Sequence, residues 1–597
     1  MSRLPVAAFA ALVAATVAAF FVTQHLKVTT PLIAGIRAPN PEVINPRGGT
    51  SCAGVDYRVS EVSFYLLHRA DDVDVYVTDQ SGAVIRTLAS GRHMRRGVRN
   101  PDGNFYWNGR EDNGTLAPDG TYFIEVALIH QGRTVILSNA AGPLPVKVKT
   151  VPPRPVVESV SPHLIGRRGP SVTIHYFGNE DRGGTVEIYR TDLPGAPRLV
   201  KSFLTPWMGR TAVWDGKIRR RPAPAGIYLV GLNVTDAACN TGHFPPQMPP
   251  APGSTPYAGV TMRYLAVQPP LEPVPAGTSA SVYVDSRQRP YRWTLRRLGA
   301  GRPLASGRSN HVRLQVPLPA GRAGLYKLSV RAGSDATAVP LAASGPSDAR
   351  ALVVLPALTW QGLNPIDDTG DGMPSTLADG RPVALARPLA DGLPAALADE
   401  GALLRFLDGS RRSYQLTTDL GLIEGVGPAL APHSTVVLAG SERWLPARTA
   451  AALRAFVAGG GHVLSLGIDS LRRGVTIRGG EALDPTGPAR TDALSAQPGA
   501  LVTHAADLIV VSQDRLGIFQ GTSGALGGYR SYQPFTVVAP AQALSEAGAT
   551  PTAPSIVGYR LGRGTVVDIG LPGFGASLAG NVDAHELLAR IWKVLGA

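Results

Sequence analysis

Residues 105–110 read Phe-Tyr-Trp-Asn-Gly-Arg, and residues 118–123 read Pro-Asp-Gly-Thr-Tyr-Phe. The same pattern returns at residues 213–217, Val-Trp-Asp-Gly-Lys, and at residues 224–229, Pro-Ala-Gly-Ile-Tyr-Leu. Trp107 precedes Tyr122 by 15 positions, and Trp214 precedes Tyr228 by 14. Internal similarity at this spacing indicates tandem copies of one small module. The repeat therefore predicts the architecture of the first half of the chain, although it points to no reaction.

The repeated unit has the pattern of a β-hairpin. Each tryptophan ends an apolar strand pattern, and Asn108-Gly109 or Asp215-Gly216 then supplies the positive-φ residues of a tight reversal. Residues 121–126 are rich in β-branched and aromatic side chains, as strands are. Upstream, apolar and polar residues alternate over 73–78, which is the period of a half-buried strand.

These motifs resemble the FlgD-type immunoglobulin-like module over residues of about 57–245. Residues 82–88, Gly-Ala-Val-Ile-Arg-Thr-Leu, and the segment from Trp107 to Tyr122 match the family pattern well. The second copy departs from it at Arg219-Arg220-Arg221, where the family is usually acidic or glycine-rich. A third strand-rich stretch, 271–345, keeps only Gly324-Leu325-Tyr326. The resemblance thus implies two to three tandem β-sandwiches, the third being a degenerate copy or a different sandwich.

The amino terminus carries one apolar segment. Residues 4–22 contain no charged side chain, and nineteen residues in a helix span about 28 Å, close to the thickness of a bilayer core. The run continues through Phe20-Phe21-Val22 past the small residues Ala18-Ala19. We therefore expect an uncleaved signal anchor, with a single pass through the cell membrane and an extracytoplasmic body. The alternative is a signal peptide and a secreted product.

Length and composition favour several turn-rich domains. The 597 residues suggest three to five domains, and the chain contains 68 Gly and 52 Pro. The formal net charge is +14, and arginine supplies most of the basic residues. This excess reflects either a codon preference for arginine or attraction to anionic envelope polymers or lipid headgroups. We expect no nucleic-acid partner, because no DNA- or RNA-binding motif accompanies the charge.

The chain has two cysteines, Cys52 and Cys239. An even number in an exported chain permits one disulfide, which would join the first module to the second. The other interpretation is two unpaired thiols, and the sequence leaves both open.

The pattern changes near residue 349. Continuous apolar runs at 351–356, 435–440 and 462–467 are typical of strands buried on both faces. Helical patterns lie between or after them, at 395–408, 446–458 and 582–595. Alternation of strand and helix predicts an α/β domain with a parallel sheet and helices on both faces.

This second half resembles the C-terminal domain of the N,N-dimethylformamidase large (beta) subunit over residues 349–597. The likeness rests on Leu-Pro at 355–356, Thr-Trp-Gln-Gly-Leu-Asn at 359–364, Arg-Pro at 387–388, Thr-Asp at 418–419 and Leu-Ala-Gly-Ser-Glu-Arg-Trp at 438–444. It implies a class I glutamine-amidotransferase-like fold. That family binds iron through two tyrosines and a glutamate. Here Leu363 and Leu389 occupy the places of aromatic residues, and only Glu442 remains as a ligand, so no iron and no other cofactor is expected.

The resemblance places the candidate site around the motifs just quoted. The candidate catalytic residues are Glu442, Asp419 and Gln361, and the expected ligand pocket consists of Trp360, Gln361, Asn364, Glu442 and Trp444. An amidotransferase thiolate is excluded, because no cysteine follows Cys239. No Gly-x-Ser-x-Gly elbow offers a serine instead.

An acidic loop follows the Trp-Gln-Gly motif. Asp367, Thr369 and Asp371 present oxygen atoms at alternating positions beside glycines, a spacing that suits Ca²⁺. The glutamate that closes an EF-hand loop is missing, since its place holds Ala378. A plain turn is the competing interpretation.

Together these features predict a multidomain protein. Its expected parts are a signal anchor or transmembrane helix (1–28), a linker (29–56), two FlgD-like domains (57–150 and 151–268), a degenerate third β-sandwich (269–347) and the α/β domain (348–597). The leading hypothesis is a membrane-anchored bacterial envelope protein whose Ig-like stalk carries a catalytically degenerate head, with a binding or structural role. Its partner would be an envelope glycan, an anionic polymer or a protein. The rival is an amide hydrolase with altered chemistry around Glu442.

Overall fold

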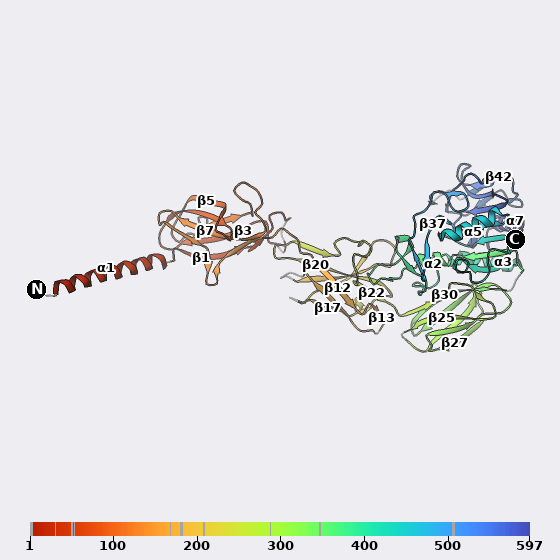
Figure 1. Cartoon of the computed structure of the whole chain (residues 1–597), viewed down its shortest axis with the longest axis horizontal. Helices are drawn as coiled ribbons and strands as arrows, with labels where there is room; N and C mark the ends of the chain where they lie inside the picture. The colour runs from red at the N-terminus through yellow and green to blue at the C-terminus, as the bar shows by residue number, and fades with distance from the viewer. Residues whose placement is uncertain are drawn as a thin grey trace.

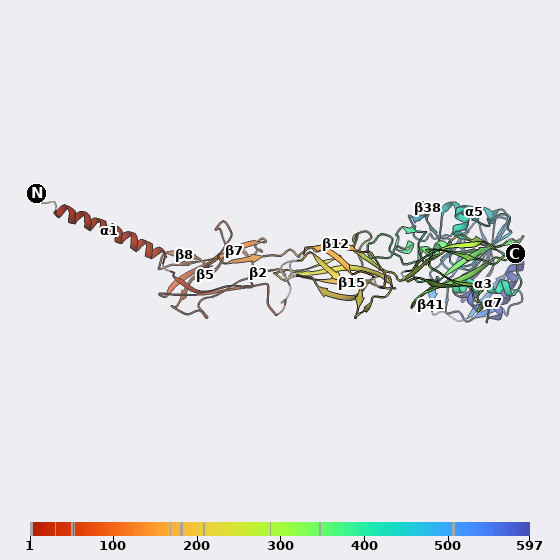
Figure 2. The same ribbon diagram turned by 90° about the horizontal axis from the view of Figure 1, so that it is seen from below.

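Three β-sandwiches and a larger C-terminal domain follow one apolar helix in an elongated molecule (Figures 1 and 2). The first two sandwiches lie in a row, and the third lies beside the C-terminal domain at the far end. The computed structural model describes residues 4–29, 31–48, 52, 54–167, 169–178, 183–206, 209–286, 288–345, 348–503 and 508–597.

The amino-terminal helix α1 (Leu4–Thr29) stands apart from the β-sandwiches (Figure 1). Its segment Val6–Thr23 has a mean hydropathy of 2.3 and is not buried against any other part of the protein. Among the residues that the structure describes, it is the one helix long and apolar enough to cross a membrane. By length and composition it is a membrane anchor or a signal sequence.

The first sandwich packs a three-stranded sheet against a six-stranded one. The small sheet has the order β1-β3-β6, and the large sheet has the order β2-β11-β7-β4-β5, with β8 also paired to β7. The strands are β1 (Ile33–Asn40), β2 (Val43–Ile44), β3 (Ser60–Leu66), β4 (Asp71–Thr78), β5 (Val84–Met94), β6 (Asn104–Trp107), β7 (Gly120–Leu128), β8 (Arg133–Ile136) and β11 (Pro145–Val148), with a separate small hairpin of β9 (Ser138–Asn139) and β10 (Gly142–Pro143).

The segment expected to be a linker, residues 29–56, contributes β1 and β2 to this sandwich. Ile33 and Ile44 are buried in its core, where Val73, Val75 and Val77 supply the alternating apolar face of β4. Strand β1 pairs with β3 through an irregular register. Because Gly, Pro and Asn interrupt its apolar pattern, the sequence of β1 does not show the alternation that marks β4.

The second sandwich repeats the arrangement of the first. Its small sheet has the order β12-β14-β17, and its large sheet has the order β13-β22-β20-β15-β16, with β21 paired to β20. The strands are β12 (Val156–Ser161), β13 (Leu164–Ile165), β14 (Val172–Phe177), β15 (Gly184–Arg190), β16 (Arg198–Leu204), β17 (Thr211–Trp214), β20 (Gly226–Thr235), β21 (Thr241–Phe244) and β22 (Gly259–Met262), with a hairpin of β18 (Lys217–Ile218) and β19 (Arg221–Pro222).

The two tryptophans occupy equivalent places, as the repeat predicts. Trp107 is 1% exposed and Trp214 is 0% exposed. The ring of Trp107 lies 4.9 Å from that of Tyr122 at 65°, and the ring of Trp214 lies 5.5 Å from that of Tyr228 at 64°. Each indole donates to the carbonyl three residues later, and each tyrosine hydroxyl donates to the proline carbonyl four residues earlier. The repeated motif is thus a hydrogen-bonded corner between the two sheets.

A third sandwich has the same strand order without the Trp–Tyr corner. Its sheets run β23-β25-β28 and β24-β30-β29-β26-β27. In all three sandwiches a two-residue strand lies at one edge of the large sheet. It pairs in parallel with the strand of that sheet that comes last along the chain. The third set comprises β23 (Leu265–Gln268), β24 (Val274–Pro275), β25 (Ser279–Ser286), β26 (Tyr291–Arg297), β27 (Ala305–Ser309), β28 (Arg313–Pro317), β29 (Gly324–Ala332) and β30 (Asp335–Ser344). Residues 265–268, expected in the second module, thus belong to the third.

The C-terminal domain is built on a nine-stranded sheet of order β33-β31-β34-β36-β48-β47-β46-β42-β43. The first five strands are parallel, and the other pairs are antiparallel. Alternate residues of the apolar run at β31 enter two different cores: Val353 and Leu355 lie in one, whereas Leu352 and Val354 lie in the other. Burial on both faces explains why the run is continuous.

The strands of this sheet are β31 (Ala351–Leu355), β33 (Gln415–Thr418), β34 (Thr435–Leu438), β36 (His462–Ser465), β42 (Leu508–Asp514), β43 (Ala525–Gly527), β46 (Gln542–Gly548), β47 (Pro554–Leu561) and β48 (Gly564–Ile569). The helices are α2 (Ala357–Gly362), α3 (Leu397–Gly409), α4 (Asp419–Glu424), α5 (Ala447–Ala458), α6 (Phe574–Ser577) and α7 (Val582–Val594), with one 3₁₀ turn, η1 (Leu377–Asp379). Short strands around them are β32 (Val383–Ala384), β38 (Thr476–Arg478) and β39 (Glu481–Leu483); β35 (Trp444–Leu445) and β37 (Arg473–Gly474); β40 (Ala496–Pro498) and β45 (Phe535–Val537); β41 (Val502–Thr503) and β44 (Ser531–Tyr532).

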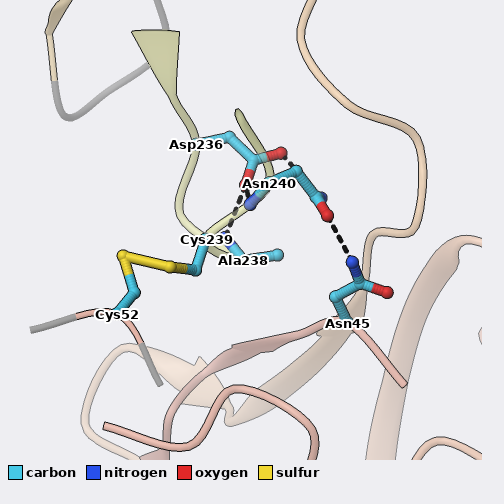
Figure 3. Close-up of a disulfide and its surroundings, with 6 residues drawn as sticks. All are labelled: Asn45, Cys52, Asp236, Ala238, Cys239 and Asn240. Carbon is cyan, nitrogen blue, oxygen red and sulfur yellow. Dashed lines mark hydrogen bonds between the residues drawn. A yellow bond between two sulfur atoms is a disulfide. The ribbon is translucent and has the colours of Figure 1, made fainter. Parts of the chain in front are cut away.

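A disulfide joins the first two sandwiches (Figure 3). Cys52 and Cys239 are bonded, and their Cα atoms are 5.8 Å apart, so the pairing that the sequence left open is present. Beside it, the buried carboxylate of Asp236 accepts hydrogen bonds from the backbone N–H groups of Ala238 and Asn240. The side chain of Asn240 then contacts Asn45 of the first sandwich (Figure 3). Covalent and polar contacts therefore fix this joint together.

Candidate functional site

The candidate residues gather at one edge of the parallel strands. Trp360 lies on α2, just after β31; Asp419 directly follows β33; and Glu442 comes four residues after β34. These three strands are neighbours in the sheet. Their carboxyl ends meet at the edge where open α/β sheets place their ligands.

Asp419 and Glu442 form a buried carboxyl pair. The backbone N–H of Leu358 donates to both oxygens of Asp419 at 3.0 and 3.1 Å, and the N–H of Leu420 donates at 2.7 Å. Burial raises the pKa of Asp419, against these hydrogen bonds and one with Glu442 that lower it. Glu442 is 1% exposed, and no N–H or O–H group of the described residues donates to its carboxyl oxygens. Burial, followed by the charge of Asp419, raises the pKa of Glu442 well above its ordinary value.

The environment of Glu442 decides what this pair can do. With Asp419 it borders a cavity of about 20 Å³ whose other walls are mainly leucine and valine side chains. This volume suits about one water molecule. The neighbouring charge of Asp419 disfavours ionisation of Glu442. Asp419 therefore holds α4 to α2 through Leu358, and the cavity beside the two carboxyl groups has no room for a substrate.

A second buried acid, Glu400, was not among the sequence candidates. It lies in the first turn of α3 and is 0% exposed. The indole Nε1 of Trp360 donates to its Oε1 at 3.3 Å, whereas its Oε2 has no partner among the described residues. Burial raises the pKa of Glu400 to about 8, so its carboxyl group is largely neutral at pH 7. The one sequence signal was the acidic pair Asp399-Glu400 at the start of a helix with an apolar side.

Glu400 borders the main cavity of this region, which we call the ligand cavity. It measures about 350 Å³, and Trp360, Asn364 and Arg443 also line it. Leu363 and Leu389, which stand where the resembling family has aromatic residues, line it as well. The remaining wall comes mainly from the segment 391–396. The cavity therefore combines a mainly apolar lining with the buried acid Glu400, the exposed acid Asp391 and Arg443, a composition typical of small-molecule sites.

Gln361 and Asn364 have structural partners. The amide of Gln361 donates to the carbonyl of Arg387 at 3.0 Å and accepts from Asn364 at 2.8 Å. The buried guanidinium of Arg387 donates to the carbonyls of Gln361, Asn364 and Ser375 and forms an ion pair with Asp368 at 2.7 Å. Gln361 does not line the ligand cavity. It holds the loop that shapes the cavity wall, and Arg387 is the centre of that network.

Trp444 also lies outside the cavity lining. It is 1% exposed, and the guanidinium of Arg473 lies 5.8 Å from its ring centroid. A side chain at Gly362 would approach the Trp444 ring to 3.1 Å. The tryptophan therefore packs beneath α2. Of the five expected pocket residues, the structure brings Trp360 and Asn364 to the cavity, whereas Gln361, Glu442 and Trp444 support it from outside.

The acidic loop at 367–372 attaches the C-terminal domain to the second sandwich. Asp367 accepts hydrogen bonds from four backbone N–H groups of its own loop, at 3.1, 2.7, 3.3 and 2.8 Å. Asp371 forms an ion pair with Arg381 at 2.8 Å. The loop carbonyls accept hydrogen bonds from Thr191, Thr255 and the backbone of Gly259 in the second sandwich. These carboxylates thus face hydrogen-bond donors, and the loop acts as a joint.

Among the residues that the structure describes, no group of three or more His, Cys, Asp or Glu side chains could hold a metal ion. Glu400, Glu442 and Asp419 influence one another electrostatically but point to different surroundings. The region therefore contains a binding cavity bordered by Glu400 and, apart from it, the buried acid pair of Asp419 and Glu442.

Residues 55–132 match the family described as the FlgD Ig-like domain, which confirms the first immunoglobulin-like module. The chain is 29% identical over 114 residues to the basal-body rod modification protein FlgD of Salmonella typhimurium and 26% identical to that of Escherichia coli K12. The matched part is 19% of this chain and 46% of each relative, so the chain spans about half the length of the curated relatives it matches.

Two solved structures that match this chain superimpose on it loosely. The mmIFT52 N-terminal domain is 15% identical, covers 32% of this chain and 89% of its own, and has a TM-score of 0.22. An E. coli alpha-2-macroglobulin is 12% identical, covers 52% of this chain and 22% of its own, and has a TM-score of 0.17. Scores this low carry no argument about fold or function.

Proposed function

We propose that the protein is a membrane-anchored envelope protein whose β-sandwiches carry a ligand-binding C-terminal head outside the cytoplasm. The observation that carries this proposal is the linear order of an unburied apolar helix, two sandwiches in a row and a cavity-bearing domain at the far end (Figures 1 and 2). The disulfide between the sandwiches supports an oxidising compartment. The helix would stay as a single-pass anchor, and secretion after cleavage is the alternative.

We further propose that the head has the class I glutamine-amidotransferase-like fold and descends from an N,N-dimethylformamidase-like domain without its activity. Five parallel strands and candidate residues at their carboxyl ends support that fold. Leu363 and Leu389 line the ligand cavity where the resembling family has aromatic residues, and neither has a donor atom for a metal. Glu442 does not line the ligand cavity and lies beside the buried Asp419. The proposed role is therefore binding or structural.

The ligand of the head would be a small molecule, or the end of an envelope glycan, an anionic polymer or a protein segment, with an apolar part for the cavity. Glu400 would offer one hydrogen bond at its inner wall. Likeness to the FlgD proteins supports the fold of the stalk, and it carries no flagellar role to this chain. Calcium at Asp367, Thr369 and Asp371 stays a prediction, which the engagement of both carboxylates by N–H donors and Arg381 disfavours.

Measurements of localisation and of chemistry on the full chain test this function. In intact cells, an added protease should digest the body of the protein, and carbonate extraction should leave the anchor segment in the membrane. The purified chain in detergent should hold no stoichiometric iron and should not hydrolyse simple formamides. A full-length product in the cytoplasmic fraction would contradict the localisation, and one iron per chain with amidase activity would contradict the non-catalytic head.

The rival function is an amide hydrolase, and one observation favours it. Glu400 is a buried acid that is neutral at pH 7 and has one unpartnered oxygen in a cavity, which is how general acids are often held. In that case Glu400→Gln would abolish hydrolysis, and Glu442→Gln would lower it through the packing of α2. If the wild-type chain hydrolyses no amide in a broad screen, this alternative fails.

A further inference from the structure

A second cavity lies away from the ligand cavity, where the third sandwich meets the C-terminal domain. It measures about 460 Å³ and is lined by Arg322, Arg411, Arg412, Asp408 and Tyr414, together with small residues. Residues 321–323 precede β29 in the sandwich, and the other lining residues lie at the end of α3 or in the loop that follows it. We call this the arginine cavity. Two separately folded parts of the chain therefore place three guanidinium groups around one opening.

The acid of the arginine cavity is already neutralised. The guanidinium of Arg297 donates to both oxygens of Asp408, at 3.0 and 2.8 Å. The hydroxyl of Tyr414 donates to the same carboxylate at 3.1 Å. This two-pronged pair is the strongest form of arginine–carboxylate contact, and it leaves little of the Asp408 charge for other cations. The three arginines of the cavity thus keep a net positive charge.

Arg412 is the most informative of the three. Its Nε is buried and has no hydrogen-bond acceptor among the described residues. Its guanidinium lies 5.8 Å from the ring centroid of Phe406 and 5.7 Å from that of Trp592. Burial lowers the pKa of Arg412, with no carboxylate contributing in the other direction. Partly desolvated cations in proteins are normally paired with an anion, and in the described part of the chain this one has none.

Arg322 and Arg411 complete the set from the surface. Both are exposed, and no ion pair joins either of them to an acid of the described residues. Arg411 adopts a positive φ of 54°, so the loop after α3 holds a left-handed residue at the cavity. Two solvent-facing guanidinium groups and a half-buried one therefore surround a space that a polyvalent anion could enter.

We propose that the arginine cavity binds phosphate groups, either free or borne by an anionic chain. The planar guanidinium offers paired N–H donors that fit phosphate oxygens, and three of them match its multiple charge better than that of a single carboxylate. The third sandwich and α3, which border the cavity, both lie in the part of the molecule remote from α1 (Figure 1).

The test measures calorimetric binding of inorganic phosphate and of tripolyphosphate to the full chain in detergent at low ionic strength. We expect both to bind, and Arg411→Ala/Arg412→Ala to weaken binding at least tenfold. Tripolyphosphate that binds at least tenfold more tightly than phosphate would identify a polymer as the source, whereas similar affinities would identify single phosphate groups. No binding of either probe would overturn the proposal.

Arg219→Ala/Arg220→Ala is the matched control, because it removes the same charge from an exposed hairpin of the second sandwich. This control should change the affinity less than twofold. If it weakens binding as much as the cavity variant, the binding is general electrostatic attraction and the proposed site is wrong. Arg322→Glu reverses one charge in an exposed loop and does not depend on the packing of Arg412. It should weaken binding at least tenfold, and unchanged affinity would also overturn the proposal.

Discussion

The Trp–Tyr corners of the first two sandwiches and the buried acids of the C-terminal domain differ in how their polar groups are satisfied. In each of the two sandwiches, the buried indole and phenol of the Trp–Tyr corner donate to backbone carbonyls. In the C-terminal domain, Glu400 and Glu442 bury carboxyl oxygens that no described group satisfies. A corner that is satisfied locally stabilises a fold, whereas unsatisfied buried acids are costly and tend to mark functional sites.

The contrast indicates where stability and function reside in this chain. Each Trp–Tyr corner agrees with its strand pattern, turn residues and sheet order, as in a segment selected for folding. The buried acids of the head lie among apolar side chains, where burial disfavours their charged forms. Four variants, ordered from the largest expected effect to the smallest, test this division.

Removal of the disulfide should have the largest effect. In the wild type the disulfide links positions 187 residues apart and so restricts the unfolded chain of the first sandwich. Cys52→Ser/Cys239→Ser removes this restriction. Chain entropy then predicts a loss of about 5 kcal/mol from the stability of the first sandwich. Urea unfolding should show this loss in the stalk transition and none in the head. Wild-type protein with a reducing agent is the control, and an unchanged stalk midpoint would contradict the role of the crosslink.

Trp107→Ala tests the corner itself. Truncation of a buried tryptophan leaves a cavity and costs about 3–5 kcal/mol, so the first sandwich should lose about 4 kcal/mol. Trp214→Ala should do the same in the second sandwich, because the two sites are equivalent. The exposed neighbour Tyr106 serves as the control, since Tyr106→Ala should change stability by less than about 0.5 kcal/mol. Unequal losses at the two tryptophans would break the equivalence of the repeats.

Glu400→Gln tests the buried acid of the head. Because the pKa of Glu400 is raised from its ordinary value to about 8, the proton stabilises the folded state. This contribution is complete below pH 4.5 and is lost as the pH rises towards 8. The wild-type head should therefore lose about 3 kcal/mol between pH 5 and pH 8 through this group, and the glutamine variant should not. Urea unfolding at both pH values measures the difference.

The control for this pH dependence is Glu586→Gln on α7, where the side chain is exposed. That variant should keep the wild-type slope. If Glu400→Gln keeps it too, Glu400 is ionised in the folded head and the neutral-acid description of the ligand cavity is wrong.

The smallest effect is expected from the corner hydroxyls. Tyr122→Phe removes one hydrogen bond to the carbonyl of Pro118 and leaves the ring in place. It should cost the first sandwich about 1 kcal/mol, and Tyr228→Phe should cost the second sandwich the same. Thermal unfolding of the two variants and the wild type gives the comparison. A loss above about 3 kcal/mol would show that the hydroxyl does more than cap the turn.

Local pattern alone identified most of the secondary structure that frames the candidate site. The apolar run at 351–355 is β31, the pattern after Pro446 is α5, and the last helical pattern is α7 within one residue. Both tryptophan corners followed from the repeat. These features depend on side-chain period and turn chemistry, which are properties of short segments. Strand β1 was not predicted, because glycine, proline and asparagine interrupt its alternation of apolar and polar residues.

What only the tertiary structure decided was which chemically capable residues meet. The sequence named Glu442, Gln361 and Asp367, yet Glu442 faces Asp419, Gln361 binds Arg387, and Asp367 shapes a joint to the second sandwich. The sequence did not point to Glu400, whose hydrogen-bond partner Trp360 lies 40 positions away in the chain. The pairing of Cys52 with Cys239 and the arginine cavity likewise join distant segments. The physical reason is that burial and the raised pKa values of these acids depend on packing between elements, which a local pattern does not encode.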